Sequence, residues 1–253
     1  MKNHIRALLV IGLGTAGSVA NAVPTIYFAE DTSTTQSVVG TASEAARSNF
    51  LSTLSGVGNE DFESFAAGTT SPALTFPGSY GSITASMTGS TCVDDVASSG
   101  CGFNNPGRWA TSGDQFWETD SGGTFGISFS SAISAFGFYG TDIGDFSNRL
   151  IISLTDISGT VSDFTVNHSL GLGNYDNALL FWGFQDLGNS YTSIAFSNSG
   201  YGGDVFAFDD MVIGDNEQIC RENCNELPEP GTLLLIGLGL AGFASRRKGC
   251  VQG

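Results

Sequence analysis

The feature that most constrains the fold is a series of short segments in which apolar residues alternate with small or polar ones. In 125–129 and 150–155 an apolar side chain occupies every second position, and 164–166, 194–196 and 206–208 repeat this period. Successive side chains of a β-strand point to opposite faces, so this period predicts strands with one buried face. Gly, Asn, Asp and Ser separate the segments, as turns require. The spacing predicts an antiparallel sandwich or barrel.

Two further patterns refine this prediction. An apolar residue recurs every four positions from Ala42 to Leu54, which predicts one helix. Thr41 and Glu44 fit a capping box, in which the hydroxyl and the carboxylate satisfy free amides of the first helical turn. The more continuously apolar run 178–184 predicts a central strand.

The two ends of the chain differ from the middle. Lys2 and Arg6 precede a mostly apolar stretch, residues 7–19, and Ala20-Asn21-Ala22 is a small-x-small cleavage site. This order predicts a secretory signal peptide that is removed after Ala22. At the other end, the uncharged segment 231–245 is followed by basic residues, and as a helix it would be about 22 Å long. That is short for a stable membrane span, but the basic cluster fits a cytoplasmic end.

The C-terminal tail, read as a whole, resembles the PEP-CTERM sorting signal of exported Gram-negative bacterial proteins. The residues that carry the resemblance are Pro228, Glu229 and Pro230 before the apolar segment, and Arg246, Arg247 and Lys248 after it. The resemblance implies a transient inner-membrane anchor that an exosortase recognises and cleaves near the Pro-Glu-Pro tripeptide. It also implies export and a final place on the cell surface or in the extracellular matrix. The same kind of tail is sometimes labelled an ice-binding-protein C-terminal region, a label that says nothing of ice for this chain.

The region between the ends also resembles the globular domains that are often joined to such tails. The matching segments are Asp61-Phe62-Glu63, expected as a strand, then Gly137 to Asp145, and finally Phe206 to Met211. The resemblance implies a lectin-like jelly roll without an assured activity. The predicted fold class is therefore all-β, a jelly-roll-like antiparallel β-sandwich with one short N-terminal helix, flanked by the signal peptide and the transmembrane sorting helix.

The chain thus divides into six predicted parts. They are the signal peptide 1–22, an N-terminal segment 23–58 with a helix at 41–54, the sandwich ectodomain 59–214, a polar linker 215–227, the sorting signal 228–248 with its transmembrane segment 231–245, and a cytoplasmic extension 249–253. The exported part has four Arg, no Lys and 24 acidic residues, which gives a net charge of about −20. Such a charge repels nucleic acid, so we expect no nucleic-acid partner.

The cysteines of the exported part form two close pairs. Cys92 and Cys101 flank a short polar loop, and Cys220 and Cys224 lie before the tail. In an oxidising space each pair is expected to form a disulfide. The alternative, four Cys on one metal ion, is disfavoured because no C-x-x-C spacing is present.

Three acidic residues suggest a cation. Asp209 and Asp210 lie in an apolar strand, where at least one must point inward, and Glu63 lies on a strand expected beside it. Calcium prefers such oxygen ligands, so calcium is the one cofactor predicted, in a structural role. Asp142 and Asp145 form a second candidate, for which a solvated turn is the simpler interpretation.

Aromatic and polar residues suggest a carbohydrate site, because the C–H faces of sugars pack on aromatic rings. The candidate set is Trp117, Glu118, Asp120, Tyr139 and Asp142, although aromatic residues in β proteins mostly form the core. Catalysis has little support, since none of the usual hydrolase or nucleotide motifs occurs. No catalytic residue is assigned, and His168, the one His left after signal removal, is expected in an exposed loop.

These observations lead to one functional expectation and one alternative. We expect an exported surface or matrix protein, processed by an exosortase, with a structural or carbohydrate-binding role in exopolysaccharide or biofilm. Its partners would be the export machinery, the exosortase and the exopolysaccharide. The alternative is a secreted polysaccharide hydrolase of the same fold class, which needs only two carboxylates.

Overall fold

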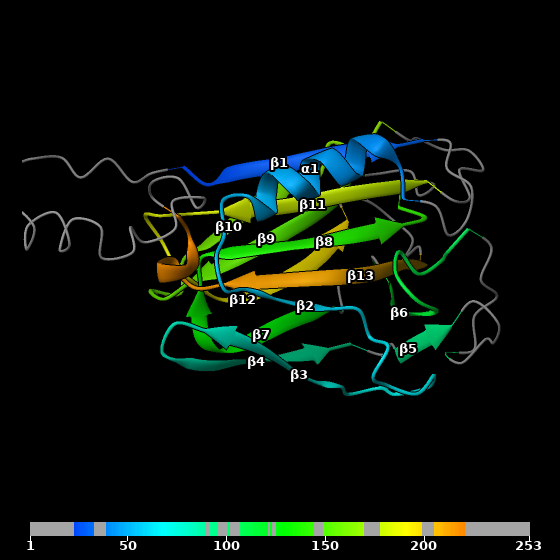
Figure 1. The fold of residues 1–253 in the computed structure, drawn as a ribbon, viewed down its shortest axis with the longest axis horizontal. Helices are drawn as coiled ribbons and strands as arrows, with labels where there is room; N and C mark the ends of the chain where they lie inside the picture. The colour runs from blue at the N-terminus through cyan, green and yellow to red at the C-terminus, as the bar shows by residue number, and fades with distance from the viewer. Residues whose placement is uncertain are drawn as a thin grey trace, which may run out of the picture.

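In the part of the chain that the structure describes, thirteen strands form two antiparallel sheets that pack face to face, and one α-helix covers the outer face of the larger sheet (Figure 1). The computed structural model describes residues 23–32, 39–89, 92–95, 101, 107–120, 122, 125–143, 149–169, 178–198 and 205–220. The predicted all-β, jelly-roll-like sandwich with one N-terminal helix is confirmed.

The larger sheet has the strand order β1-β11-β8-β13-β6-β5, and β2 pairs with the far end of β13. Its strands are β1 (Thr25–Asp31), β2 (Gly58–Glu60), β5 (Cys92–Asp95), β6 (Gln115–Asp120), β8 (Ala135–Thr141), β11 (Leu179–Gln185) and β13 (Val205–Gly214). The first and the last strand of the chain, β1 and β13, thus belong to one sheet, and β11 and β8 lie between them.

The smaller sheet has the order β10-β9-β12-β7-β4-β3 and lies behind the larger one in Figure 1. Its strands are β3 (Ala73–Gly78), β4 (Gly81–Thr88), β7 (Gly126–Ile133), β9 (Leu150–Asp156), β10 (Val161–Thr165) and β12 (Tyr191–Asn198). The strands β3, β4 and β9 show the alternation of buried and open positions that is typical of a sheet with one solvated face.

Phenylalanine fills the space between the sheets, as the composition indicates. Phe138 and Phe208 are fully buried and stack with ring centroids 4.6 Å apart, and Phe125 and Phe196 do the same. Offset and edge-to-face ring pairs of this kind add to the gain from burying apolar area.

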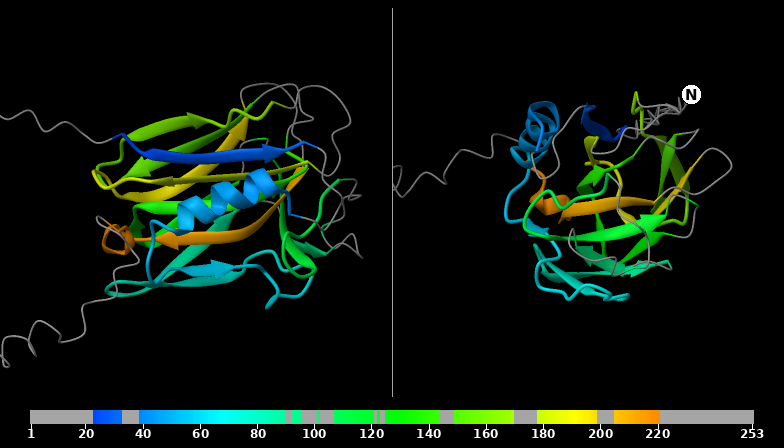
Figure 2. Two further views of the ribbon diagram at one scale, coloured as in Figure 1. Left: turned by 45° about the horizontal axis from the view of Figure 1, so that its top comes forward. Right: turned by 90° about the vertical axis from the view of Figure 1, so that its right-hand side faces the viewer.

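A second apolar layer explains the continuous run in β11. The helix α1 (Thr41–Leu51) packs on β1, β11 and β8, so the larger sheet is buried on both faces (Figure 2). Phe181 faces the helix side and Trp182 faces the other sheet, and both are buried. Gly137 allows the close approach, because a Cβ there would lie 2.9 Å from the rings of Phe50 and Phe181.

The helix begins differently from the prediction. Gly40 is the N-cap and no side-chain cap comes from Thr41, so the predicted capping box is wrong. The free amides are instead satisfied by Asp31 at the end of β1, whose carboxylate accepts hydrogen bonds from Ala42 and Ser43 at 3.2 and 2.8 Å. A carboxylate at this position also suits the positive end of the helix dipole. The helix ends at Leu51, three residues before the predicted end.

Several strands depart from the prediction. Asp61-Phe62-Glu63 is not a strand but a turn after β2, with Phe62 at φ 59° and its ring buried. The strand β1 lies within the predicted N-terminal segment 23–58, and β2 begins at the last residue of that segment, Gly58; both pair with strands of the larger sheet. The hairpin β3–β4 and the strands β5 and β6 were not predicted as strands. Among the described residues, no helix is long and apolar enough to span a membrane, and the predicted segment 231–245 lies outside them.

Candidate functional site

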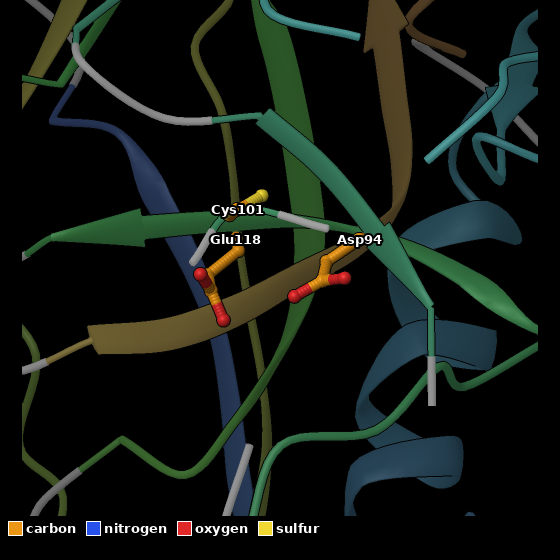
Figure 3. Close-up of side chains that lie close together, drawn as sticks. All are labelled: Asp94, Cys101 and Glu118. Carbon is orange, nitrogen blue, oxygen red and sulfur yellow. The ribbon is translucent and has the colours of Figure 1, made fainter. Parts of the chain in front are cut away.

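A group of buried charged side chains lies beside the disulfide between Cys92 and Cys101. Figure 3 shows Asp94 of β5 and Glu118 of β6 gathered with Cys101, and one ligand atom from each lies within 4.8 Å of the others. The register places Cys92 opposite Glu118, which brings these elements together. Asp94 and Glu118 are both fully buried.

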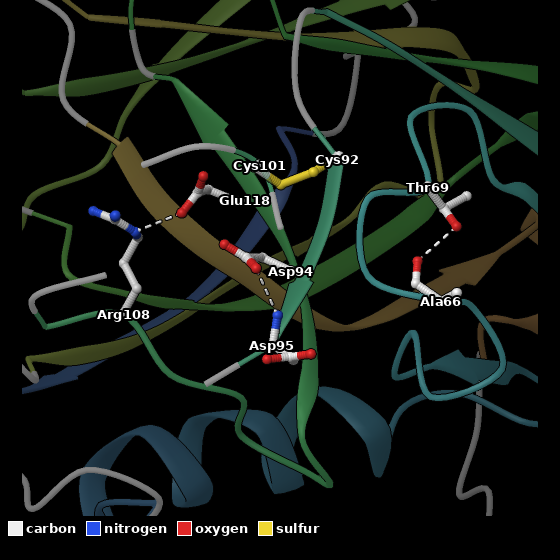
Figure 4. The surroundings of a disulfide bond; sticks show 8 residues. All are labelled: Ala66, Thr69, Cys92, Asp94, Asp95, Cys101, Arg108 and Glu118. Atoms are coloured by element: carbon white, nitrogen blue, oxygen red, sulfur yellow. Dashed lines mark hydrogen bonds and ion pairs between the residues drawn. A yellow bond between two sulfur atoms is a disulfide. The ribbon is translucent and has the colours of Figure 1, made fainter. Parts of the chain in front are cut away.

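Arg108 supplies the positive charge for this group (Figure 4). Its Nε donates to Glu118 at 2.9 Å, and its Nη1 lies 3.6 Å from an oxygen of Asp142. The same Nη1 donates to the backbone carbonyl of Val205 at 3.2 Å. The guanidinium therefore fastens the segment before β6 to the start of β13 and to the end of β8.

The pKa of the Glu118 carboxyl is raised to about 7. Burial is the main cause because it disfavours the charged form, and the nearby Asp94 carboxylate adds to it. Arg108 opposes both effects by its charge and its hydrogen bond. Glu118 therefore titrates near neutral pH.

The chemistry open to this group is limited by burial. Cys101 is bonded to Cys92, with 5.6 Å between their Cα atoms, so it offers no thiolate to a metal. Glu118 is 0 % exposed and Arg108 is 5 % exposed. The arrangement is a buried ion-pair cluster that holds three strand ends together.

A second group of buried carboxylates lies in the middle of β13. A β-bulge shifts the register between Asp209 and Val212, and Asp210 takes φ 50°. Both Asp side chains are therefore buried, because the bulge interrupts the alternation of faces. The sequence pattern predicts that at least one of these two Asp side chains is buried. In the structure both are buried, because the bulge interrupts the alternation.

The partners of these two carboxylates are mostly neutral donors. Asp209 accepts hydrogen bonds from the backbone amides of Thr111 and Ser112 at 2.6 and 3.3 Å, and from the Thr111 hydroxyl at 2.8 Å. Asp210 accepts from Asn59 Nδ2 at 2.6 Å. Burial, followed by the charge of Asp210, raises the pKa of Asp209 well above its ordinary value.

Glu63, the third predicted calcium ligand, is used elsewhere. Its Oε1 accepts hydrogen bonds from the amides of Asp114 and Gln115 at 2.8 and 2.5 Å. Within the described part of the chain, Glu63, Asp209 and Asp210 are not among the groups whose ligand atoms lie within 4.8 Å of one another. Carboxylates held this way by amides and hydroxyls act as loop anchors. Calcium at these residues stays a prediction.

The predicted carbohydrate residues lie in the interior. Trp117 and Tyr139 are 1 % and 2 % exposed, and Glu118 and Asp142 are also buried. The Tyr139 hydroxyl donates to Glu44 at 2.7 Å, and the guanidinium of Arg47 lies over its ring. Asp120 is the last residue of β6. The positions of the buried residues do not support sugar stacking by this set, which stays a prediction.

The remaining predicted residues divide between described and undescribed regions. The disulfide between Cys92 and Cys101 is confirmed. Cys220 is disulfide-bonded, and its predicted partner Cys224 lies outside the described residues. The signal peptide, the sorting residues 228–230 and 246–248, and Asp145 also lie outside them. His168 is fully buried, so the expectation of an exposed loop His is wrong.

A surface pocket was not predicted from the sequence. It has a volume of about 250 Å³ and lies where the β3–β4 turn, the end of β7 and the segment after β13 meet. We call it the Tyr80 pocket; its lining residues are Tyr80, Gly81, Ser82, Ile83, Ser131, Ala132, Ser190, Asp215, Asn216 and Glu217. Tyr80 is 93 % exposed, the most exposed large apolar side chain among the described residues. The sequence feature that could have indicated this pocket is the Tyr in a short Gly-Ser-Tyr-Gly turn, where a side chain is expected to be exposed.

Comparison with known protein families identifies a motif in the C-terminal tail. A model of the PEP-CTERM protein-sorting motif matches residues 226–248. The chain carries this sorting motif. Its presence implies that the protein is exported, is anchored transiently in the membrane and is sorted by an exosortase. A search of the curated proteins gave no match.

A solved structure is also similar to the chain. It is described as the K2 cleaved adhesin domain of Lys-gingipain, with 14 % sequence identity and a TM-score of 0.38. The match covers 62 % of this chain and 97 % of that domain. A similarity of this size carries no argument about function.

Proposed function

We propose that the protein is a surface or matrix component whose β-sandwich binds extracellular polysaccharide without cleaving it. The observation that carries this proposal is the sorting motif at 226–248 directly after a folded, disulfide-bonded sandwich. A domain delivered to the cell exterior meets polysaccharide there as an abundant polymer.

The charge and the interior of the domain support a binding role. With about −20 net charge, the exported part is suited to remain soluble and to avoid anionic surfaces. The carboxylates of Asp94 and Glu118, which have oxygens within 4.8 Å of each other, are fully buried, whereas a glycosidase must bring two carboxyl groups against its substrate.

The test is binding of the exported domain, residues 23–226, to polysaccharide from a host that carries an exosortase. Binding is measured by calorimetry with calcium and with a chelator, and the polymer length is followed by size-exclusion chromatography. Binding with unchanged polymer length is expected. Loss of binding in the chelator would support the predicted calcium.

Two other results would contradict the proposal. Shortening of the polymer would favour the alternative, a polysaccharide hydrolase. No binding in either condition would leave a purely structural surface protein, and self-assembly of the purified domain would then be the property to measure.

A further inference from the structure

We infer that the Tyr80 pocket is a subsite for one uncharged pyranose residue, bound with its C–H face on the Tyr80 ring and its hydroxyls toward Glu217 and Ser131. The inference rests on the proposed function, because it assigns a place and a sugar class to polysaccharide binding. It uses none of the residues that the sequence suggested for that role.

The size of the pocket fits a single sugar ring. Its volume of about 250 Å³ falls just below the range of about 300–1,000 Å³ that is typical for drug-sized ligands. Its lining includes the buried, apolar Ile83 and the exposed Ser82 and Ser131. An apolar floor with a few polar groups is the usual composition of a small-molecule site.

The walls of the pocket are held in place by one carboxylate. Asp215 Oδ2 accepts a hydrogen bond from the Ser79 amide at 2.6 Å, and its Oδ1 accepts from the Ser79 hydroxyl at 2.7 Å. The same Oδ1 accepts from the amides of Glu217 and Gln218 at 3.1 and 3.2 Å. Asp215 therefore joins the turn that carries Tyr80 to the segment that carries Glu217.

Other hydrogen bonds fix the opposite side. The hydroxyls of Ser134 and Ser190 lie 2.8 Å apart, and Asn216 Nδ2 donates to the carbonyl of Leu187 at 3.4 Å. A site whose walls are already ordered loses little conformational entropy on binding. The Tyr80 ring is then presented to solvent on a fixed turn, where a ligand can stack on it.

The charge of the pocket selects the class of sugar. Asp215 and Glu217 line it, and among its described lining residues there is no Lys or Arg. Like charges repel, so uronic acids, sulfated sugars and anionic lipid headgroups are disfavoured. A neutral pyranose offers hydroxyl donors to the Glu217 carboxylate and an apolar ring face to Tyr80.

The test uses the exported protein, purified from a host that carries an exosortase. Methyl β-glucopyranoside, methyl β-galactopyranoside and methyl glucuronide are titrated against it and followed by saturation-transfer NMR. For so small a ligand in a shallow site, dissociation constants on the order of 1 mM are expected for the neutral sugars, with no binding of the glucuronide.

Three variants separate the contacts. Tyr80→Ala is expected to weaken neutral-sugar binding about tenfold, while Tyr80→Phe retains the ring and the affinity. Glu217→Gln is expected to keep the neutral sugar and to admit the glucuronide. Ile157→Ala is the matched control, since Ile157 is 73 % exposed on another turn and does not line the pocket. Thermal unfolding of Tyr80→Ala should be unchanged, because the side chain is exposed.

The outcomes distinguish this inference from the proposed function. If the protein binds polysaccharide and Tyr80→Ala binds it equally well, the pocket is wrong and the wider proposal stands. If the methyl glycosides bind in a Tyr80-dependent way but the polysaccharide does not, the pocket stands and the matrix role falls. Tyr80-dependent binding to phosphatidylethanolamine–phosphatidylglycerol vesicles, without sugar binding, would overturn the inference in favour of a membrane contact.

Discussion

Replacing Arg108 with Met tests whether the buried ion-pair cluster is held together by this one cation. Arg108 is 5 % exposed, and it contacts the fully buried Glu118 at 2.9 Å and the buried Asp142 at 3.6 Å. Removing one partner of a buried ion pair leaves an uncompensated charge and costs about 3–5 kcal/mol. At pH 8, above the pKa of Glu118, we expect a loss of that size in the free energy of unfolding.

The loss should depend on pH in a way that the wild type already indicates. The pKa of Glu118 is raised from 4.5 to about 7, so the folded state holds an extra proton between these two values. Its contribution to stability is therefore full below pH 4.5 and is lost as pH rises through 7. At pH 5 Glu118 is already protonated, so Arg108→Met should cost less than at pH 8.

The assay is urea unfolding of residues 23–226 at pH 5 and pH 8, followed by the fluorescence of the buried Trp109, Trp117 and Trp182. The matched control is Arg47→Met, because the Arg47 side chain is 19 % exposed and lies 3.9 Å from Asp210. That loss should be smaller than the loss for Arg108→Met and should not change between pH 5 and pH 8 through Glu118, because Arg47 is more exposed and its ion pair is longer. Glu118→Gln should reduce the wild-type slope between pH 4.5 and 7, to which Asp209 with its raised pKa also contributes, and should recover part of the Arg108→Met loss.

Three results would refute this reasoning. The first is a loss below about 1 kcal/mol at pH 8, which would mean that water reaches the cluster. The second is an equal loss at both pH values, and the third is a wild-type slope that is unchanged in Glu118→Gln. Either of the last two would show that Glu118 is not the group that titrates.

The remaining predictions concern the core, the disulfide and the tail. Phe138→Ala should lower the free energy of unfolding by about 3–5 kcal/mol in urea, whereas Val161→Ala at a site 57 % exposed should change it by less than about 0.5 kcal/mol. Replacing Cys92 and Cys101 with Ser opens a ring with a sequence separation of 9, and should cost up to about 3 kcal/mol in the same assay; no loss would mean that the ring does not restrict the unfolded chain. Replacing the residues 228–230 with Ala should leave an unprocessed, membrane-bound precursor on immunoblots of a host with an exosortase, and unchanged release would contradict the sorting role.

The strands that could be predicted are those whose two faces differ. Leu150, Ile152 and Leu154 face the core and the residues between them do not, so the period of two is visible in the sequence. In β6, by contrast, Phe116 and Trp117 are consecutive and both buried, because the sheet is covered on both faces there. Such a strand has no period to detect.

The β3–β4 hairpin did carry a signal. Leu74 and Phe76 alternate with exposed residues, as do Ile83, Ala85 and Met87 on the returning strand. The sequence therefore held a local pattern for this hairpin, although the hairpin was not predicted. A local pattern was not sufficient for the start of the helix, where the capping carboxylate of Asp31 is 11 residues away from Ala42.

The candidate sites were harder to predict because they join distant segments. Arg108 and Val205 are 97 residues apart, and Asp215 and Ser79 are 136 apart. Only the order of the strands in the sheets brings such pairs together, and the spacing of residues along the chain does not predict that order. The Trp and Tyr residues that suggested a sugar site, Trp117 and Tyr139, belong to the buried core. Tyr80, whose ring is exposed, lies in a turn for which the sequence predicted no site.

The large number of acidic residues does not by itself indicate a metal site or a catalytic site. The exported part has four Arg and no Lys, so most carboxylates cannot find a cation within the chain. They serve instead as acceptors for amides and hydroxyls at strand ends. Asp186 holds Gly188, Asn189 and Tyr191 in this way, and its hydrogen bond is one cause of the raised pKa of the Tyr191 hydroxyl, after burial.

The same use recurs at both ends of the sandwich. Asp31 caps the helix, Glu63 and Asp209 hold the loop before β6, and Asp215 joins two walls of the Tyr80 pocket. One carboxylate with two oxygens can accept three or four hydrogen bonds, more than any neutral side chain. In a chain with so few basic residues, a buried Asp beside a turn therefore indicates, in the first place, a loop that is held by hydrogen bonds to the carboxylate. Evidence for a metal or a catalytic site must come from oxygens that these donors leave open.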